Sequence, residues 1–91
     1  AITGIIEYTI KNGICYVSLF NVKTTTTNDG LSISTTMPKP AINSGSVIVT
    51  KGTSGNIGFI YINKGTTQLK ANFYVTDLLG NCSFSYPVAE S

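Results

Sequence analysis

One stretch, residues 55–76, limits the possible folds more than any other part of the chain. It contains two runs rich in Ile, Tyr, Phe, Thr and Val, separated by Lys64-Gly65, which is the pattern of a β-hairpin. With these two residues as the loop, one face is apolar, with Ile62 opposite Thr67, Ile60 opposite Leu69, Gly58 opposite Ala71, then Phe73 and Val75. The other face is aromatic and polar, with Tyr61 opposite Gln68, Phe59 opposite Lys70, then Ile57, Asn72 and Tyr74. A one-residue slip would mix the two faces, so the pattern specifies the pairing.

A second hairpin is predicted for residues 3–10 and 14–22, around Asn12-Gly13. Asn-Gly tolerates the two positive φ angles of a type I′ turn. The core face then pairs Ile10 with Cys15, Tyr8 with Val17 and Ile6 with Leu19, and the opposite face pairs Thr9 with Tyr16, Glu7 with Ser18 and Ile5 with Phe20. Ile5, Tyr16 and Phe20 are more apolar than open solvent requires. They are expected to lie under another strand or against a neighbouring subunit.

The rest of the chain adds three strands and their connections. Residues 31–36 and 81–86 alternate between apolar and polar, and residues 46–51 form a short apolar run typical of a buried strand. Two prolines make residues 37–40 an extended crossover. Loops or turns are expected at 23–30, 51–55 and 77–80, and a frayed end at 87–91. The sequence therefore predicts a single all-β domain, 1–91, folded as an antiparallel sandwich or barrel of about seven strands.

Composition indicates that this domain is part of something larger. Only 11% of residues are charged while 42% are hydrophobic, against about 25% charged in an average domain. Such a chain is expected in an oligomer or as a fragment cut from a longer protein. The positive charge consists of scattered lysines with no arginine, so no basic stripe is available for nucleic acid. No apolar run is long enough for a membrane-spanning helix, and no secretion leader is indicated at Ala1.

The residue types needed for most enzyme sites are missing. The chain has no histidine, which excludes Ser/His/Asp and Cys/His arrangements. The carboxylates of Glu7, Asp29, Asp77 and Glu90 show no pairing, and no metal-ligand spacing or phosphate-binding loop is present. The chain is therefore expected not to be an enzyme unless a catalytic partner lies on another chain, and to hold neither metal nor cofactor.

The two cysteines, Cys15 and Cys82, fall inside predicted strands far apart in sequence. A disulfide between them would close a long loop. Two buried free thiols are the favoured alternative, because the chain is not cysteine-dense in the way of small secreted scaffolds.

Three segments resemble the carboxy-terminal receptor-binding heads of tail-fibre or baseplate proteins from phages and prophages of Gram-positive bacteria. Residues 8–17 are similar to the strand, Asn-Gly turn and strand that open these heads. Residues 36–40 are similar to their Leu-Pro-x-Pro crossover, with Met37 in place of the leucine. Residues 55–69 are similar to the short strand, glycine turn and strand that precede a final aromatic strand.

This resemblance implies a homotrimer of barrel or jelly-roll heads at the tail tip of a virion, each cut from a longer fibre and binding a host cell-wall or surface saccharide. Outward aromatics interleaved with amides fit this ligand, because sugar C–H faces stack on rings and sugar hydroxyls bind planar amides. Tyr61 and Tyr74 are then the expected stacking rings. Their expected hydrogen-bonding partners are Asn63, Gln68 and Asn72.

Two other functions are open at this point. A purely structural module would trimerise or cap a fibre, with an interface expected at Ile5, Tyr16, Phe20 and Phe59. An adhesin-type sandwich from a bacterial surface protein would be monomeric, and a bridge between Cys15 and Cys82 would favour it.

Overall fold

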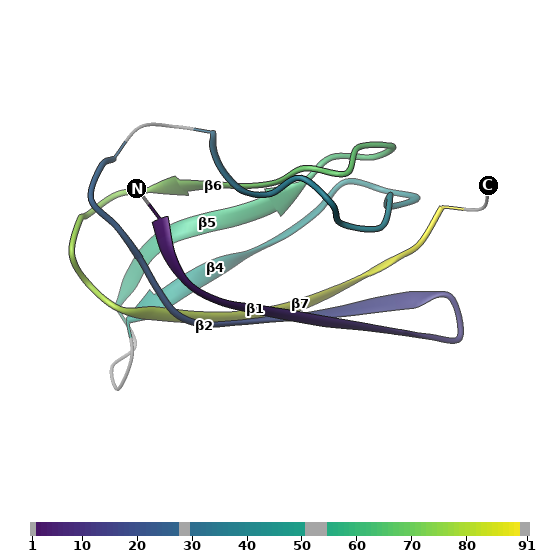
Figure 1. Cartoon of the computed structure of the whole chain (residues 1–91), viewed down its shortest axis with the longest axis horizontal. Coiled ribbons are helices and arrows are strands. Elements are labelled where there is room, and N and C mark those ends of the chain that lie inside the picture. Colours follow the sequence, from purple (N-terminus) through teal and green to yellow (C-terminus); the bar gives the residue numbers. More distant parts are fainter. Residues whose placement is uncertain (1, 28–29, 51–54, 90–91) are drawn as a thin grey trace.

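The chain folds into one antiparallel sheet that curls into a nearly closed barrel (Figure 1). The computed structural model describes residues 2–27, 30–50 and 55–89. Within these ranges the strands are β1 (Ile2–Lys11), β2 (Ile14–Thr24), β3 (Leu31–Ser34), β4 (Ser44–Thr50), β5 (Asn56–Ile62), β6 (Leu69–Phe73) and β7 (Gly80–Pro87). Their order in the sheet is β1-β2-β7-β4-β5-β6-β3. The predicted all-β antiparallel class and the number of strands are confirmed.

Strand β7 lies in the middle of the sheet although it comes last along the chain. It pairs with β2 over most of its length, from Ile14 opposite Pro87 to Leu19 opposite Cys82. With β4 it pairs only at one end, where Val49 faces Asn81 and Thr50 faces Gly80. Beyond that point β4 and β7 part, and the strands on either side form two layers (Figure 1).

The core fills the space between these layers. It contains the inward-facing residues of β2, β5, β6 and β7, together with Ile48 of β4 and Met37 of the crossover. Alternation of side chains along each strand delivers these residues to one face. Tyr86 is the largest fully buried side chain.

The β1–β2 hairpin has the predicted register, residue by residue from Ile5 opposite Phe20 to Ile10 opposite Cys15. Both turn residues have positive φ, 53° at Asn12 and 77° at Gly13, as a type I′ turn requires. The prediction of a core face is wrong for part of β1, because Tyr8 and Ile10 are 46% and 50% exposed. They lie on the inner side of an edge strand, and the end of the hairpin projects away from the opposite layer (Figure 1).

The register of β5 with β6 differs from the prediction by two residues. Ile62 faces Leu69 and Ile60 faces Ala71, so the loop spans residues 63–68 instead of Lys64-Gly65 alone. The crossover holds this longer loop: the Gly65 amide donates to the Pro40 carbonyl at 3.1 Å, and the amide of Met37 donates to the carbonyl of Thr67 at 3.0 Å. An even shift keeps every paired side chain on its predicted face.

Three smaller predictions about burial are also wrong. Ile57 points into the core, because a bulge between β4 and β5 changes the register beside it. Val75, expected on the apolar face, follows the end of β6 and is 38% exposed. Val47 is 45% exposed, so β4 is buried on one face only.

The end of the described chain is tied down where fraying was expected. The Val88 amide donates to the Gly13 carbonyl at 2.9 Å, and the Ala89 amide donates to the Lys39 carbonyl at 2.8 Å. The turn at 77–80 is present, with φ of 64° at Asp77. The turn expected at residues 28–29, most of the loop at 51–55, and the last two residues lie outside the described ranges, as do the carboxylates Asp29 and Glu90.

Candidate functional site

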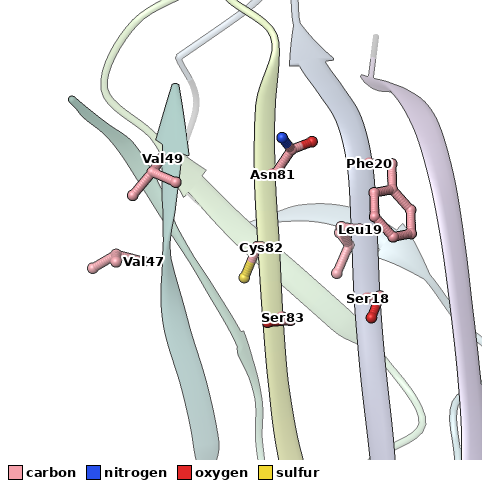
Figure 2. A pocket seen from close by; sticks show the side chains of 8 residues that line it. All are labelled: Ser18, Leu19, Phe20, Val47, Val49, Asn81, Cys82 and Ser83. Carbon is pink, nitrogen blue, oxygen red and sulfur yellow. The ribbon is translucent and has the colours of Figure 1, made fainter. Parts of the chain in front are cut away.

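A depression of about 390 Å³ lies on the outside of the sheet where β4 leaves β7 (Figure 2). Strand β2 forms one side of it, β7 the middle and β4 the other side. Its lining residues are Ser18, Leu19, Phe20, Val47, Val49, Asn81, Cys82 and Ser83. Because β7 and β4 pair at only two positions within the described residues, the sheet opens beside Ser83 and leaves this hollow.

Two further depressions continue the hollow across β7, β2 and β1. One of about 300 Å³ adds Tyr16 and Ser85, and one of about 220 Å³ adds Glu7 and Thr9. Ser18 lines all three depressions, so they form one shallow surface, which we call the outer groove.

The outer groove combines small hydroxyl side chains with exposed apolar edges. Ser18 and Ser83 face each other across β2 and β7, so two hydroxyl side chains lie side by side in its middle. Phe20 on one side and Val47 on the other are each 45% exposed. At one end, the Asn81 side-chain oxygen accepts a hydrogen bond from the backbone amide of Asn21 at 3.1 Å. This bond fixes the orientation of the Asn81 side chain.

Cys82 contributes to the base of the groove but lacks the surroundings of a reactive thiol. Burial raises the pKa of Cys82, and a hydrogen bond with the Ser46 side chain only partly opposes this effect. A reactive cysteine needs the opposite shift, because the thiolate is the nucleophile.

Both cysteines are buried free thiols, in agreement with the favoured alternative. Cys82 faces Leu19, whereas Cys15 faces Tyr86. The two cysteines are therefore four residues apart along the β2–β7 ladder, roughly 13 Å, and a disulfide needs Cα atoms within about 7 Å.

The side chains expected at an interface all lie on the outer surface. Ile5 is 55% exposed, Tyr16 49%, Phe20 45% and Phe59 37%. Tyr16 and Phe20 line the outer groove, and Ile5 faces Phe20 across the β1–β2 ladder. Phe59 faces Val47 on the far side of the groove and stacks on Tyr61, with ring centroids 6.3 Å apart.

The five residues expected to bind saccharide are spread over β5, β6, the loop between these strands and the residue after β6. The Tyr74 amide donates a hydrogen bond to the carbonyl of Ile57, so Tyr74 lies beside Ile57. Ile57 is four residues from Tyr61 along β5, which separates Tyr74 from Tyr61 by roughly 13 Å. The Asn72 side-chain oxygen accepts a hydrogen bond from the Gly30 amide at 2.6 Å. Asn63 and Gln68 belong to the loop after β5 and are exposed. None of the five lines the outer groove.

The serines of the groove were not predicted as site residues, although two sequence patterns indicated which faces they share. The alternation in residues 81–86 indicated that Asn81, Ser83 and Ser85 share one face, and the hairpin register placed Ser18 on the face opposite the core. The missing information was that β7 inserts between β2 and β4, which brings together residues more than 60 positions apart.

The described residues give no indication of a metal site or of a membrane-spanning helix. Residues 2–27, 30–50 and 55–89 contain no group of three or more His, Cys, Asp or Glu that could hold a metal ion. The same ranges contain no helix long and apolar enough to cross a membrane. No protein-family model matches the chain, and neither a curated protein nor a solved structure gives a significant match.

Proposed function

We propose that the chain is a recognition head that binds a cell-surface saccharide in the outer groove. The observation that carries this proposal is the juxtaposition of paired serine hydroxyls with exposed aromatic and aliphatic edges on one open surface. The resemblance to receptor-binding heads of phage tail fibres and baseplates adds the biological setting. In that setting the head acts at the tip of a virion tail and recognises a Gram-positive host.

The groove suits a sugar because a sugar ring has both apolar and polar surfaces. Its C–H faces would pack on Phe20 and Tyr16, which gain both buried area and ring contact. Its hydroxyls would exchange hydrogen bonds with Ser18, Ser83 and the Asn81 amide, replacing those made to water. A shallow, open surface of this kind admits one stretch of a long polymer, and does not require a chain end.

The groove lies within one chain, so saccharide binding does not depend on the number of copies. The homotrimer implied by the resemblance stays a prediction. So do the contributions of Tyr61, Asn63, Gln68, Asn72 and Tyr74, which would act as a second contact surface on β5 and β6.

Replacing Phe20 by alanine is the direct test of the groove. We expect Phe20→Ala to weaken binding to a Gram-positive wall polysaccharide about tenfold, since a lost ring contact and its buried area are worth about 1–2 kcal/mol. Titration calorimetry on the purified domain measures the effect. Leu78→Ala is the matched control, because Leu78 is as exposed as Phe20, at 45%, and lies outside the groove, so its loss should leave the affinity unchanged.

Two results would contradict the proposal. One is a wild-type domain that binds none of a panel of wall polysaccharides. The other is an affinity that falls for Tyr74→Ala and not for Phe20→Ala, which would move the site to β5 and β6.

A structural module that joins or caps a fibre is the second candidate function. The observation that favours it is the exposure of Ile5, Tyr16, Phe20 and Phe59, since large apolar surface patches mark contacts between proteins. A stable oligomer that protects these side chains and binds no saccharide would support it. The adhesin alternative loses the disulfide that would have favoured it, because both cysteines are free.

A further inference from the structure

Strand β1 forms one edge of the sheet and has the features of a strand that can accept a neighbour. Among the described strands its one partner is β2, and residues 5–11 pair with β2 without irregularity or proline. Proteins usually blunt exposed edges with bulges, prolines or short strands. Here the bulge is confined to the start of β1, between Thr3 and Ile5.

On the side away from β2, the backbone of β1 has hydrogen-bonding groups that no other described residue pairs with. In a two-residue hairpin the residues next to the turn, Lys11 and Ile14, exchange hydrogen bonds. Pairs then alternate along the ladder, so the N–H and C=O groups of Tyr8 and Ile10 point outward from the sheet edge. The side chains of these two residues are about half exposed, although they lie on the core side of the sheet.

The charges of β1 are placed symmetrically about Thr9. Glu7 lies two residues before it and Lys11 two residues after it, and within the described part of the chain neither has an ion-pair partner. Suppose a second copy of β1 pairs antiparallel with the first, centred on Thr9. Glu7 of each copy then lies opposite Lys11 of the other, and Tyr8 of each lies opposite Ile10 of the other.

Other centres do not match the charges. Centring on Tyr8 places Glu7 opposite Thr9 and Lys11 opposite Ile5 of the second copy. Centring on Glu7 places two like charges opposite each other, which is destabilising. A centre between two residues would bring the core side of one copy against the outer side of the other.

We propose that β1 pairs with β1 of a second copy of this chain, antiparallel and centred on Thr9, to form a two-fold dimer. The outward backbone groups of Tyr8 and Ile10 supply the ladder hydrogen bonds. Glu7 and Lys11 then fall at the positions between those bonds, where side chains across an antiparallel ladder come closest. The contact is self-complementary, as a two-fold interface requires.

The proposal goes beyond saccharide binding and makes a geometric statement about it. The two-fold axis is perpendicular to the sheet, so both copies keep the same side outward. The two outer grooves would therefore open on the same face of one continuous sheet. This arrangement differs from the trimer implied by the resemblance, and the solution mass separates the two.

Charge reversal tests the pairing by sedimentation equilibrium from micromolar to millimolar protein. We expect the wild-type chain to show a monomer–dimer equilibrium, and Glu7→Lys or Lys11→Glu to raise the dissociation constant at least about tenfold, because two attractive pairs become repulsive. The double variant Glu7→Lys/Lys11→Glu restores attraction with the signs exchanged, and should recover the wild-type value. Lys64→Glu changes the net charge as Lys11→Glu does, but on an exposed loop, and should have no effect.

A second variant tests the backbone part of the contact. Tyr8→Pro removes an N–H that points away from β2, so it should abolish the dimer while circular dichroism shows the fold retained. A wild-type chain that remains monomeric at millimolar concentration, or forms a trimer, overturns the proposal. So does a dimer that is indifferent to the single reversals or is not recovered by the double variant.

Discussion

At the residue scale, Tyr86 ties the central strand to the crossover. Its ring is 1% exposed, and its hydroxyl donates a hydrogen bond to the Pro38 carbonyl at 2.8 Å. Burial is the main cause that raises the pKa of Tyr86, and a hydrogen bond with Cys15 raises it further. The folded protein therefore holds the phenolic proton more tightly than the unfolded chain does.

Tyr86→Phe should reduce the free energy of unfolding by about 1–2 kcal/mol at neutral pH, because the Pro38 carbonyl loses its buried donor. The same change should alter the alkaline behaviour. Below the ordinary tyrosine pKa of 10.0 the Tyr86 contribution is complete. Above that pH the unfolded chain loses the proton first, so stability falls by up to about 1.4 kcal/mol per pH unit from this group.

Urea unfolding at pH 8, 10.5 and 11 measures both effects. The wild-type protein should lose more stability across this range than Tyr86→Phe, and the gap between them should narrow as the pH rises. At pH 8, Tyr74→Phe is the control for loss of a tyrosine hydroxyl, since Tyr74 is 59% exposed and the change should alter stability by no more than about 0.5 kcal/mol. Parallel profiles for the wild type and Tyr86→Phe would show that the buried hydroxyl does not titrate as described.

At the element scale, the crossover between β3 and β4 holds one end of the barrel together. Met37 is 2% exposed and belongs to the core. Pro40 is buried, forms a bridge with Val88, and accepts a hydrogen bond from Gly65. The two prolines that exclude this segment from a central strand leave their carbonyls free to accept such bonds.

Met37→Ala should cost about 2–5 kcal/mol of stability, because it removes a buried side chain from a packed site. Ile42→Ala is the matched control on the same segment. Ile42 is 54% exposed, so its loss should change stability by no more than about 0.5 kcal/mol. Chemical denaturation measures both, and similar losses for the two variants would mean that the crossover does not pack as a core element.

The two hairpins show which parts of an element can be predicted from sequence. The β1–β2 register followed from Asn12-Gly13, because a two-residue turn fixes the pairing locally. The β5–β6 register was wrong by two residues, because the loop exchanges hydrogen bonds with the crossover, which is remote in sequence. The assignment of paired side chains to the two faces was still correct, because a shift by an even number of residues does not change which face a side chain lies on.

At the scale of the whole molecule, adjacency of distant strands decides the candidate site. The sequence predicted which residues share a face within β2 and within β7, but not that these strands are neighbours. The outer groove depends on that adjacency, and on the early parting of β4 from β7. Predictions for single residues such as Phe20 therefore pointed to an outer face, and only the structure places Phe20 beside Ser18 and Asn81.

A chain that ends at residue 79 should fail to fold, although it contains six of the seven strands. Strand β7 supplies the hydrogen bonds that link β1 and β2 to the group formed by β3, β4, β5 and β6. Without β7 the two groups would each have to bury their apolar faces alone. We expect no cooperative thermal transition by circular dichroism. A sharp transition in this shortened chain would show that one group is stable by itself.

The central place of β7 also governs when the protein can fold during its synthesis. As the ribosome makes the chain, β1 to β6 emerge first. The edges of β2 and β4 that face β7 stay unpaired until β7 has been translated. Open strand edges are sites of mispairing between nascent chains. Completion of the sheet is thus delayed until β7 has emerged. Mispairing at these two edges is therefore most favoured in a crowded polysome, where many unfinished copies lie close together.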